Sequence, residues 1–255
     1  MPAPEDDTVR FWGLASTHEQ LDGSCLARRE AAPRLGLATF LYAVTPRDTE
    51  VLRQDLATAA ARGCRRVVVE DRTPRWVEAE LLLDGWAAED ELRLVLPDRQ
   101  ALAGTAPQHR MLRAEDADPA WAARRAMLRT DHLEEDARHG VPERPVADTD
   151  ATVAHRQALE RHATYFCAER RGDVAGFVCA WRAPSGQGVV EDVFVAPEHR
   201  GHGVATALLR HAVGALRAEG AGPVGIAAEV GDTPGHLYAR LGFRPHRTVR
   251  SLSVP

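Results

Sequence analysis

Residues 189–210 read V-V-E-D-V-F-V-A-P-E-H-R-G-H-G-V-A-T-A-L-L-R, a run that predicts a strand, a loop and a helix in that order. The β-branched and aromatic residues 189–195 have the length and composition of a strand, and Pro197 ends it. Gly201 and Gly203 then open a helix whose expected stop is Gly220.

A glycine-bearing loop at a helix N-terminus predicts an anion site, because the first-turn N–H groups lack helical partners and the helix dipole favours negative charge. Arg200 adds a cation suited to phosphate oxygens. A Walker loop is excluded because the chain contains no Lys. A dinucleotide fingerprint is excluded because Thr206 stands where its third Gly is required.

The pattern V-x-P-x-x-R-G-x-G-x-A does fit, over Val195–Ala205. It resembles the acetyl-CoA loop of the GCN5-related N-acetyltransferases (GNAT), whose signature is Q/R-x-x-G-x-G/A. The resemblance implies acetyl-CoA as co-substrate and a mixed α/β GNAT fold. It also implies that acetyl-CoA binds to Val193, Val195, Arg200, Gly201, His202, Gly203, Val204 and Ala205.

A second motif follows at residues 236–243, H-L-Y-A-R-L-G-F. It resembles the GNAT segment L-Y-x-x-x-G-F, which implies that Tyr238 faces the cofactor sulfur and protonates the leaving thiolate. The alternative is a core Tyr that packs on the sheet. Family members often carry an Asn just before this helix, whereas Gly231 and Asp232 stand near that place here.

Acyl transfer from a thioester to an amine also needs a base. Glu191 is the candidate, because strand alternation places it on the face shared with Val193 and Val195, and many relatives use a Glu on this strand. Asp192, expected to point the other way, is the second choice. The alternative for Glu191 is a solvated strand carboxylate. Neither motif offers a Cys, Ser or Lys for a covalent intermediate, and no metal is expected.

An internal repeat predicts two tandem copies. Residues 64–97 and the end of the chain share the order strand, Thr-Pro, helix, Gly-aromatic, strand, Pro. After Pro46, however, the first copy has no R-G-x-G, and Asp48 and Glu50 would repel a phosphate. We therefore expect a degenerate GNAT-like domain at 1–104 and a catalytic GNAT domain at 105–255, a layout similar to that of mycothiol synthases. The alternative for the first segment is an unrelated small α/β domain.

The remaining elements follow from pattern and turn residues. In the first copy, strands are expected near residues 9–14, 24–30 and 36–44. The second copy should open with a strand at 110–113 and a helix from Pro119, with Asp118 as N-cap. Further expectations are a linker at 101–108, a polar stretch at 131–150, a helix at about 150–162, and a hairpin of residues 164–169 and 174–181.

Composition limits the partners. The net charge of −5 gives no reason to expect nucleic acid, and the longest uncharged apolar run, residues 35–45, is too short to cross a bilayer. No apolar export segment follows the N-terminus, so the expected location is the cytoplasm. Four scattered cysteines without a C-x-x-C pair indicate small hydrophobes rather than metal ligands.

The motifs together predict an N-acetyltransferase that moves an acetyl group directly to the primary amine of a small molecule. The alternatives are a protein or peptide N-acetyltransferase and a non-catalytic acyl-CoA-binding protein. Residues 131–150 carry seven acids against two Arg, which suggests an acidic rim that would draw in a cationic amine; a merely solvated loop is the plainer interpretation. The amine, the acyl-chain preference and the oligomeric state stay open.

Overall fold

A computed structural model describes residues 6–105, 108–113 and 119–254 and divides the chain into two compact units. The first unit comprises Met1–Arg93, Ala227–Gly235 and Pro245–Pro255; the second comprises Leu94–Ile226 and His236–Arg244. Strands β5 (Ala87–Leu96), β10 (Val224–Glu229) and β11 (Arg244–Ser253) therefore have residues in both units. The predicted boundary between residues 104 and 105 separates two copies in the sequence. The division into compact units does not test this boundary, which stays a prediction.

The first unit contains a mixed sheet in the order β1-β2-β3-β4-β11. β1 (Thr17–Gln20), β2 (Cys25–Arg28) and β3 (Phe40–Tyr42) are antiparallel, β3 and β4 (Arg66–Val69) are parallel, and β11 returns antiparallel to β4. The helices are α1 (Asp7–Gly13), α2 (Thr49–Ala61) and α3 (Arg75–Leu83). Their core includes Leu26, Leu41, Leu52, Val67 and Leu81, all buried.

The second unit contains the order β10-β9-β8-β7-β6. Its strands are β6 (Arg110–Arg113), β7 (Thr164–Arg170), β8 (Asp173–Arg182) and β9 (Gly188–Val195), all antiparallel to their neighbours, with β10 parallel to β9. Its helices are α4 (Pro119–His139), α5 (Val146–Leu159), the short 3-10 helix η1 (Pro197–His199) and α6 (Val204–Ala218); α7 (Thr233–Leu241) has residues in both units. The strand–loop–helix prediction and the hairpin are confirmed.

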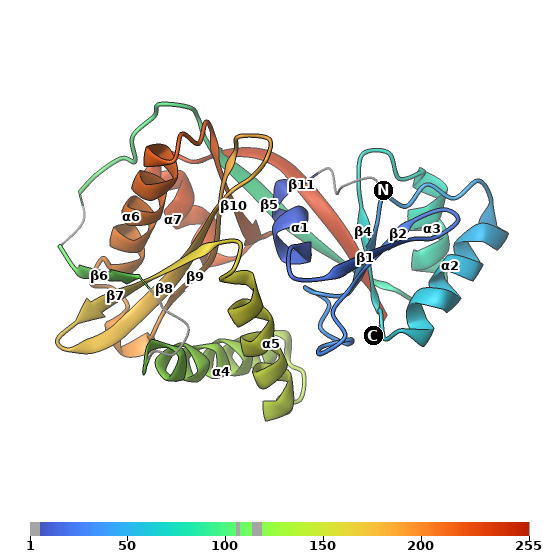
Figure 1. Ribbon diagram of the computed structural model, residues 1–255, viewed down its shortest axis with the longest axis horizontal. Coiled ribbons are helices and arrows are strands. Elements are labelled where there is room, and N and C mark those ends of the chain that lie inside the picture. Colours follow the sequence, from blue (N-terminus) through green and yellow to red (C-terminus); the bar gives the residue numbers. More distant parts are fainter. Residues whose placement is uncertain (1–5, 106–107, 114–118, 255) are drawn as a thin grey trace. The chain divides into compact units, whose positions relative to one another are not determined.

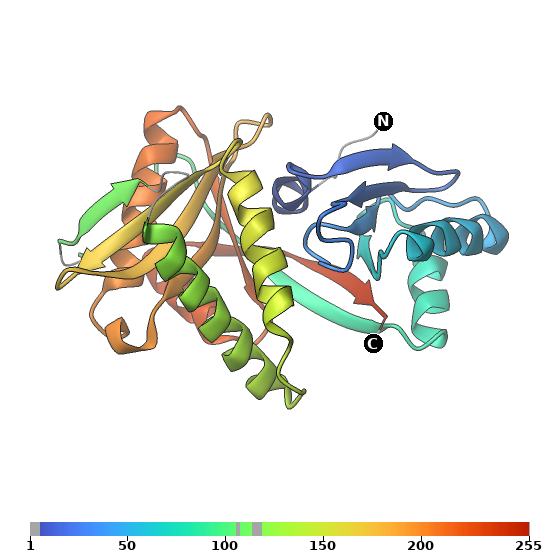
Figure 2. The same cartoon turned by 60° about the horizontal axis from the view of Figure 1, so that its bottom comes forward.

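Helices cover both faces of this second sheet (Figure 1, Figure 2). Successive residues of β7 show the two faces, because side chains alternate along a strand. Tyr165 packs on Trp121 of α4, with ring centroids 6.0 Å apart, whereas Phe166 packs on His211 of α6 at 4.6 Å. One face therefore belongs to α4 and α5, and the other to α6.

Residues 9–14 were predicted as a strand, and this prediction is wrong. They lie mainly in α1, because the Asp6 carboxylate accepts hydrogen bonds from the N–H groups of Thr8 (3.0 Å) and Val9 (3.2 Å). A carboxylate at this N-cap position satisfies first-turn donors, which outweighs the strand preference of the β-branched and aromatic residues that follow.

The expectation that residues 131–150 form a polar loop is also wrong. α4 continues to His139 through Glu, Ala and Arg, which favour helices, and Gly140 then adopts a positive φ of 65°. α5 begins at Val146, so the connection is only residues 140–145. The predicted N-cap of α4, Asp118, lies outside the described residues, as do residues 106–107 of the predicted linker.

Five of the seven acidic side chains of this region are paired with arginines, so the acidic rim that would draw in a cationic amine stays a prediction. Arg144 binds Glu135 and Asp136 at 2.8 and 2.5 Å, and the Asp136 side chain is only 3% exposed. Glu134, Glu143 and Asp150 bind Arg200, Arg129 and Arg125. Within the described residues, no helix combines the length and apolar character needed to cross a membrane.

Candidate functional site

Strand β9 carries an irregularity in its middle. Its register with β8 pairs Glu191 with Cys179 and Phe194 with Phe177, so three steps along β9 match two along β8. Asp192 lies at this bulge with a positive φ of 56°. Bulges re-aim side chains because the extra residue interrupts the two-residue alternation of the strand.

The bulge changes which residues share a face. Tyr165 pairs with Cys179 across β7 and β8, and Cys179 pairs with Glu191, so all three lie on the α4–α5 face. The Asp192 carboxylate also points to this face, where it contacts Arg156 of α5. The expectation that Asp192 points away from Glu191 is therefore wrong.

The same bulge corrects the predicted alternation around Glu191. Phe194 pairs with Phe177, two residues from Cys179, and so lies on the α4–α5 face. Val193 and Val195 alternate with Phe194 and point to the opposite face. Glu191 thus does not share a face with these two valines, because the alternation that would place it there is interrupted at Asp192.

The Asp192 carboxylate is enclosed by hydrogen-bond donors. Arg156 donates from Nη2 to Oδ1 (2.6 Å) and from Nε to Oδ2 (2.8 Å), and the Tyr165 hydroxyl donates to Oδ2 (2.7 Å). The side chains of Arg156 and Asp192 are only 8% and 5% exposed. The Asp192 carboxylate is thus engaged by three hydrogen bonds, and the choice between Glu191 and Asp192 as the base stays a prediction.

A further carboxyl lies near this group and was missed by sequence reasoning. Asp131 of α4 is part-exposed, and burial raises its pKa to about 6, with Glu135, Asp192 and Glu134 adding to the rise and Arg156 opposing it. Tyr165 and Arg156 were missed as well. No local pattern marks them, since they meet Asp192 from a different strand and a different helix.

The edge of β9 away from β8 bears on the acetyl-CoA contacts predicted for Val193 and Val195. The N–H of Ala196 donates to Ala175 O of β8 at 3.0 Å. Backbone groups alternate between the two edges of a strand, so the N–H groups of Val193 and Val195 point to the edge away from β8. On that edge, pairing with β10 covers Gly188–Val190, before the bulge. The geometry is compatible with a ligand along Val193 and Val195.

The loop after β9 has the backbone that an anion site needs. Gly201 and Gly203 have φ of 74° and 76°, which side chains other than Gly rarely adopt. A Cβ added at Gly201 would meet no atom within 4 Å, so the backbone is open to a ligand. Gly203 is the N-cap of α6 and supplies no side-chain bond to the first turn, which begins with Val204 and Ala205. These features fit a pyrophosphate at the helix N-terminus.

Two other predicted loop residues make contacts within the protein. Arg200 donates to both oxygens of Glu134 (3.0 and 2.7 Å) and to Val195 O (3.0 Å). His202 is exposed, and its Nδ1 lies 2.7 Å from Arg200 O. A phosphate that bound Arg200 would therefore compete with a carboxylate for the guanidinium.

Tyr238 lies in α7, in the same compact unit as β9 and α6, and is 4% exposed. Its ring packs 6.2 Å from that of Phe243, where Gly242 (φ 105°) ends the helix. Burial of this kind suits both a core Tyr and an acid that faces an enclosed thiolate. Its role as an acid stays a prediction.

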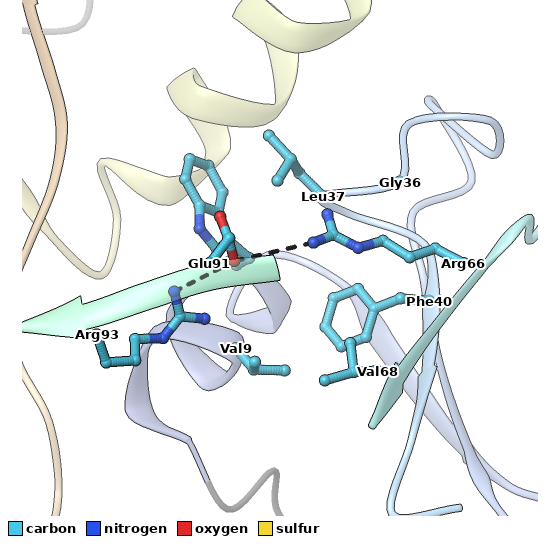
Figure 3. A pocket seen from close by; sticks show the side chains of 9 residues that line it. Val9, Gly36, Leu37, Phe40, Arg66, Val68, Glu91 and Arg93 are labelled. Atoms are coloured by element: carbon cyan, nitrogen blue, oxygen red, sulfur yellow. Dashed lines mark hydrogen bonds and ion pairs between the residues drawn. The ribbon is translucent and has the colours of Figure 1, made fainter. Parts of the chain in front are cut away.

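The first unit also holds a pocket, lined by Trp12, Phe40 and Val68 and by charged side chains (Figure 3). Arg66 and Arg93 both approach Glu91 there, at 4.0 and 3.2 Å. We place the candidate site in the second unit instead, because the glycine turn before α6 and the two carboxylates of β9 lie there. Among the described residues, no group of three or more His, Cys, Asp and Glu could hold a metal ion.

Comparisons with known proteins agree with this placement. Residues 125–243 match the Acetyltransferase (GNAT) family. Streptothricin acetyltransferase of Streptomyces lavendulae is 37% identical over 82 residues, which cover 31% of this chain and 43% of that protein. This chain thus matches less than half the length of that relative.

Solved structures extend the likeness in fold to nearly the whole chain. A GCN5-related N-acetyltransferase from Kribbella flavida matches with a TM-score of 0.65 at 16% identity, covering 98% of this chain and 96% of that one. A tandem GNAT protein from the clavulanic acid biosynthesis pathway matches with a TM-score of 0.61 at 17% identity, covering 100% and 89%. The predicted fold is confirmed, including its tandem character.

Proposed function

Because this chain carries a GNAT-family domain, matched over residues 125–243, we propose that it is an acetyl-CoA-dependent N-acetyltransferase that acetylates the primary amine of a small molecule. The observation that carries this proposal is the junction of β9 and α6. The described register pairs β9 with β10 only up to Val190, so the edge of β9 beyond this residue is not paired with β10. Two glycines with positive φ follow β9, and the N-terminus of α6 after them has no side-chain cap. The relative that acts on streptothricin supports a small-molecule acceptor.

In this proposal acetyl-CoA lies along β9, with its pyrophosphate on the N–H groups that follow Gly203. The amine nitrogen attacks the thioester carbonyl, the carbon–sulfur bond breaks, and no covalent enzyme intermediate forms. Glu191 accepts the proton that the amine loses, directly or through water, and Tyr238 gives its hydroxyl proton to the thiolate. Backbone N–H groups of β9 stabilise the negative charge on the carbonyl oxygen.

The test is a panel of amines, streptothricin among them, incubated with acetyl-CoA while free thiol is measured. We expect thiol release that depends on the amine and is abolished by Gly203→Asp, which adds a side chain and a negative charge where the pyrophosphate binds. Tyr238→Phe should lower kcat about 10²- to 10⁴-fold while CoA affinity changes little, because it removes an interaction made in the transition state.

Two outcomes would contradict the assignment. If Tyr238→Phe lowers the melting temperature sharply and leaves kcat of the remaining folded protein unchanged, Tyr238 is a core residue. If the folded protein binds CoA but releases no thiol with any amine of the panel, including peptides with free α-amino groups, the acyl-CoA-binding alternative is favoured.

A further inference from the structure

The backbone of Asp192 needs outside support. A φ of 56° is uncommon for any residue with a side chain, although Asp tolerates it better than most. In the middle of a strand such a turn also interrupts regular pairing. Local preference therefore favours relaxation to extended backbone, and something else in the fold must hold Asp192 in this conformation.

The contacts that do so converge on one carboxylate. Arg156 grips both oxygens in a two-pronged arrangement, at 2.6 and 2.8 Å, and Tyr165 adds a third hydrogen bond at 2.7 Å. Arg156 belongs to α5 and Tyr165 to β7, so the carboxylate is tied to two elements distant in sequence from β9. A paired, buried Arg–carboxylate fork specifies geometry strongly, because breaking it leaves a charge buried without its partner.

The register links this contact to Glu191. With the bulge, Glu191 and Asp192 lie on the same α4–α5 face, beside Cys179. If the turn relaxed to a regular strand, alternation would move one of the two carboxylates to the opposite face. Because Asp192 is bonded to Arg156 and Tyr165, the turn that it anchors also sets where Glu191 points.

We propose that Arg156, Asp192 and Tyr165 form a clamp that positions Glu191, the base of the proposed reaction, by holding the left-handed turn of β9. The clamp residues are positioning residues: their polar groups bind one another and leave the proton transfer to Glu191. The inference rests on the proposed acetyl transfer, but its backbone part can be measured without turnover.

The test compares Asp192→Gly with Asp192→Ala. Both variants leave Arg156 without its carboxylate partner, so both lose the same stabilising contact. Only Ala has to place a Cβ at φ 56°, whereas Gly adopts this conformation freely. We expect Asp192→Ala to lower kcat at least about tenfold, with KM for acetyl-CoA within about twofold of wild type, and Asp192→Gly to retain clearly more kcat.

Asp192→Asn provides the conservative control. Asn tolerates positive φ and still accepts a hydrogen bond from Tyr165, so its kcat should lie above that of Asp192→Ala. Hydrogen exchange of the β9 amides gives a readout independent of turnover. It should be faster in Asp192→Ala than in Asp192→Gly, because the relaxed turn breaks the pairing between β8 and β9.

The outcomes separate the clamp from the reaction. Wild-type kcat and wild-type exchange of the β9 amides in Asp192→Ala would overturn the clamp, even if the wild type is an active acetyltransferase, because the turn would then hold without the carboxylate. A wild type that transfers no acetyl group would contradict the proposed function. In that case amide exchange still decides whether the clamp holds the turn, and exchange in Asp192→Ala equal to that of the wild type would refute it.

Discussion

At the scale of single residues, the contact between Arg200 and Glu134 bears directly on cofactor binding. Both side chains are well exposed, at 46% and 39%, so the pair contributes little to stability. Glu134 does bind the Arg200 guanidinium, which the GNAT resemblance assigns to the cofactor. We expect Glu134→Gln to tighten CoA binding about 2- to 5-fold, since pairs of this kind are worth up to about 1 kcal/mol. Calorimetric titration with CoA measures the change.

The matched control is Glu135→Gln. It removes the same charge from the neighbouring position of α4, but its partner is Arg144 at 2.8 Å. It should leave CoA affinity close to that of wild type at physiological salt, where exposed charges are screened beyond about 8 Å. A weaker affinity in Glu134→Gln alone would mean that Glu134 orients Arg200 rather than competing for it.

At the scale of elements, the contact between α4 and α5 includes a buried histidine. His132 is 7% exposed, and its Nδ1 lies 2.9 Å from Thr149 Oγ1. Burial lowers the pKa of His132 to about 4, with Arg144, Arg156 and Arg129 lowering it further and Asp136 opposing them. The pKa of His132 in the folded state lies below that in the unfolded chain, so the unfolded state binds more protons between pH 6.5 and 4. The free energy of unfolding therefore decreases as the pH is lowered through this window.

His132→Gln should remove this loss while keeping a group that can bond Thr149. Relative to pH 8, the variant should gain about 2 kcal/mol of unfolding free energy over wild type at pH 5, an order-of-magnitude figure from about 1.4 kcal/mol per pKa unit. Urea unfolding at both pH values measures it. Asp131, whose raised pKa gives the opposite slope, is present in both proteins and cancels in the difference. Parallel pH dependence would show that His132 is not the titrating group.

At the scale of the whole molecule, the two units offer different helix N-termini to a phosphate. α6 begins at Gly203 without a side-chain cap, whereas α2 begins at Asp48, whose carboxylate accepts from Val51 N at 2.9 Å. A carboxylate already placed on the first turn of α2 excludes a second anion there. We therefore expect one acetyl-CoA per chain by calorimetry, and none after Gly203→Asp. A stoichiometry of two would contradict the prediction that the first copy is degenerate.

The sequence by itself determined the features that depend on local chemistry. Strand β9, the glycine turn and α6 could be predicted, because hydrophobic period, Gly at positive φ and helix stops are properties of neighbouring residues. The same holds for α7, whose stop is Gly242. The GNAT fold followed from two such motifs and is confirmed. The roles of Glu191 and Tyr238 in catalysis stay predictions.

Only the tertiary structure decided what depends on residues far apart in the chain. The bulge at Asp192 leaves no mark in V-V-E-D-V-F-V, since Arg156 and Tyr165 hold it from α5 and β7. The acids of α4 could be counted from the sequence, but their pairing with Arg144 and Arg200 depends on how the segments fold together. A charge pattern states which groups are available, whereas distance and burial determine which charges remain to meet a ligand.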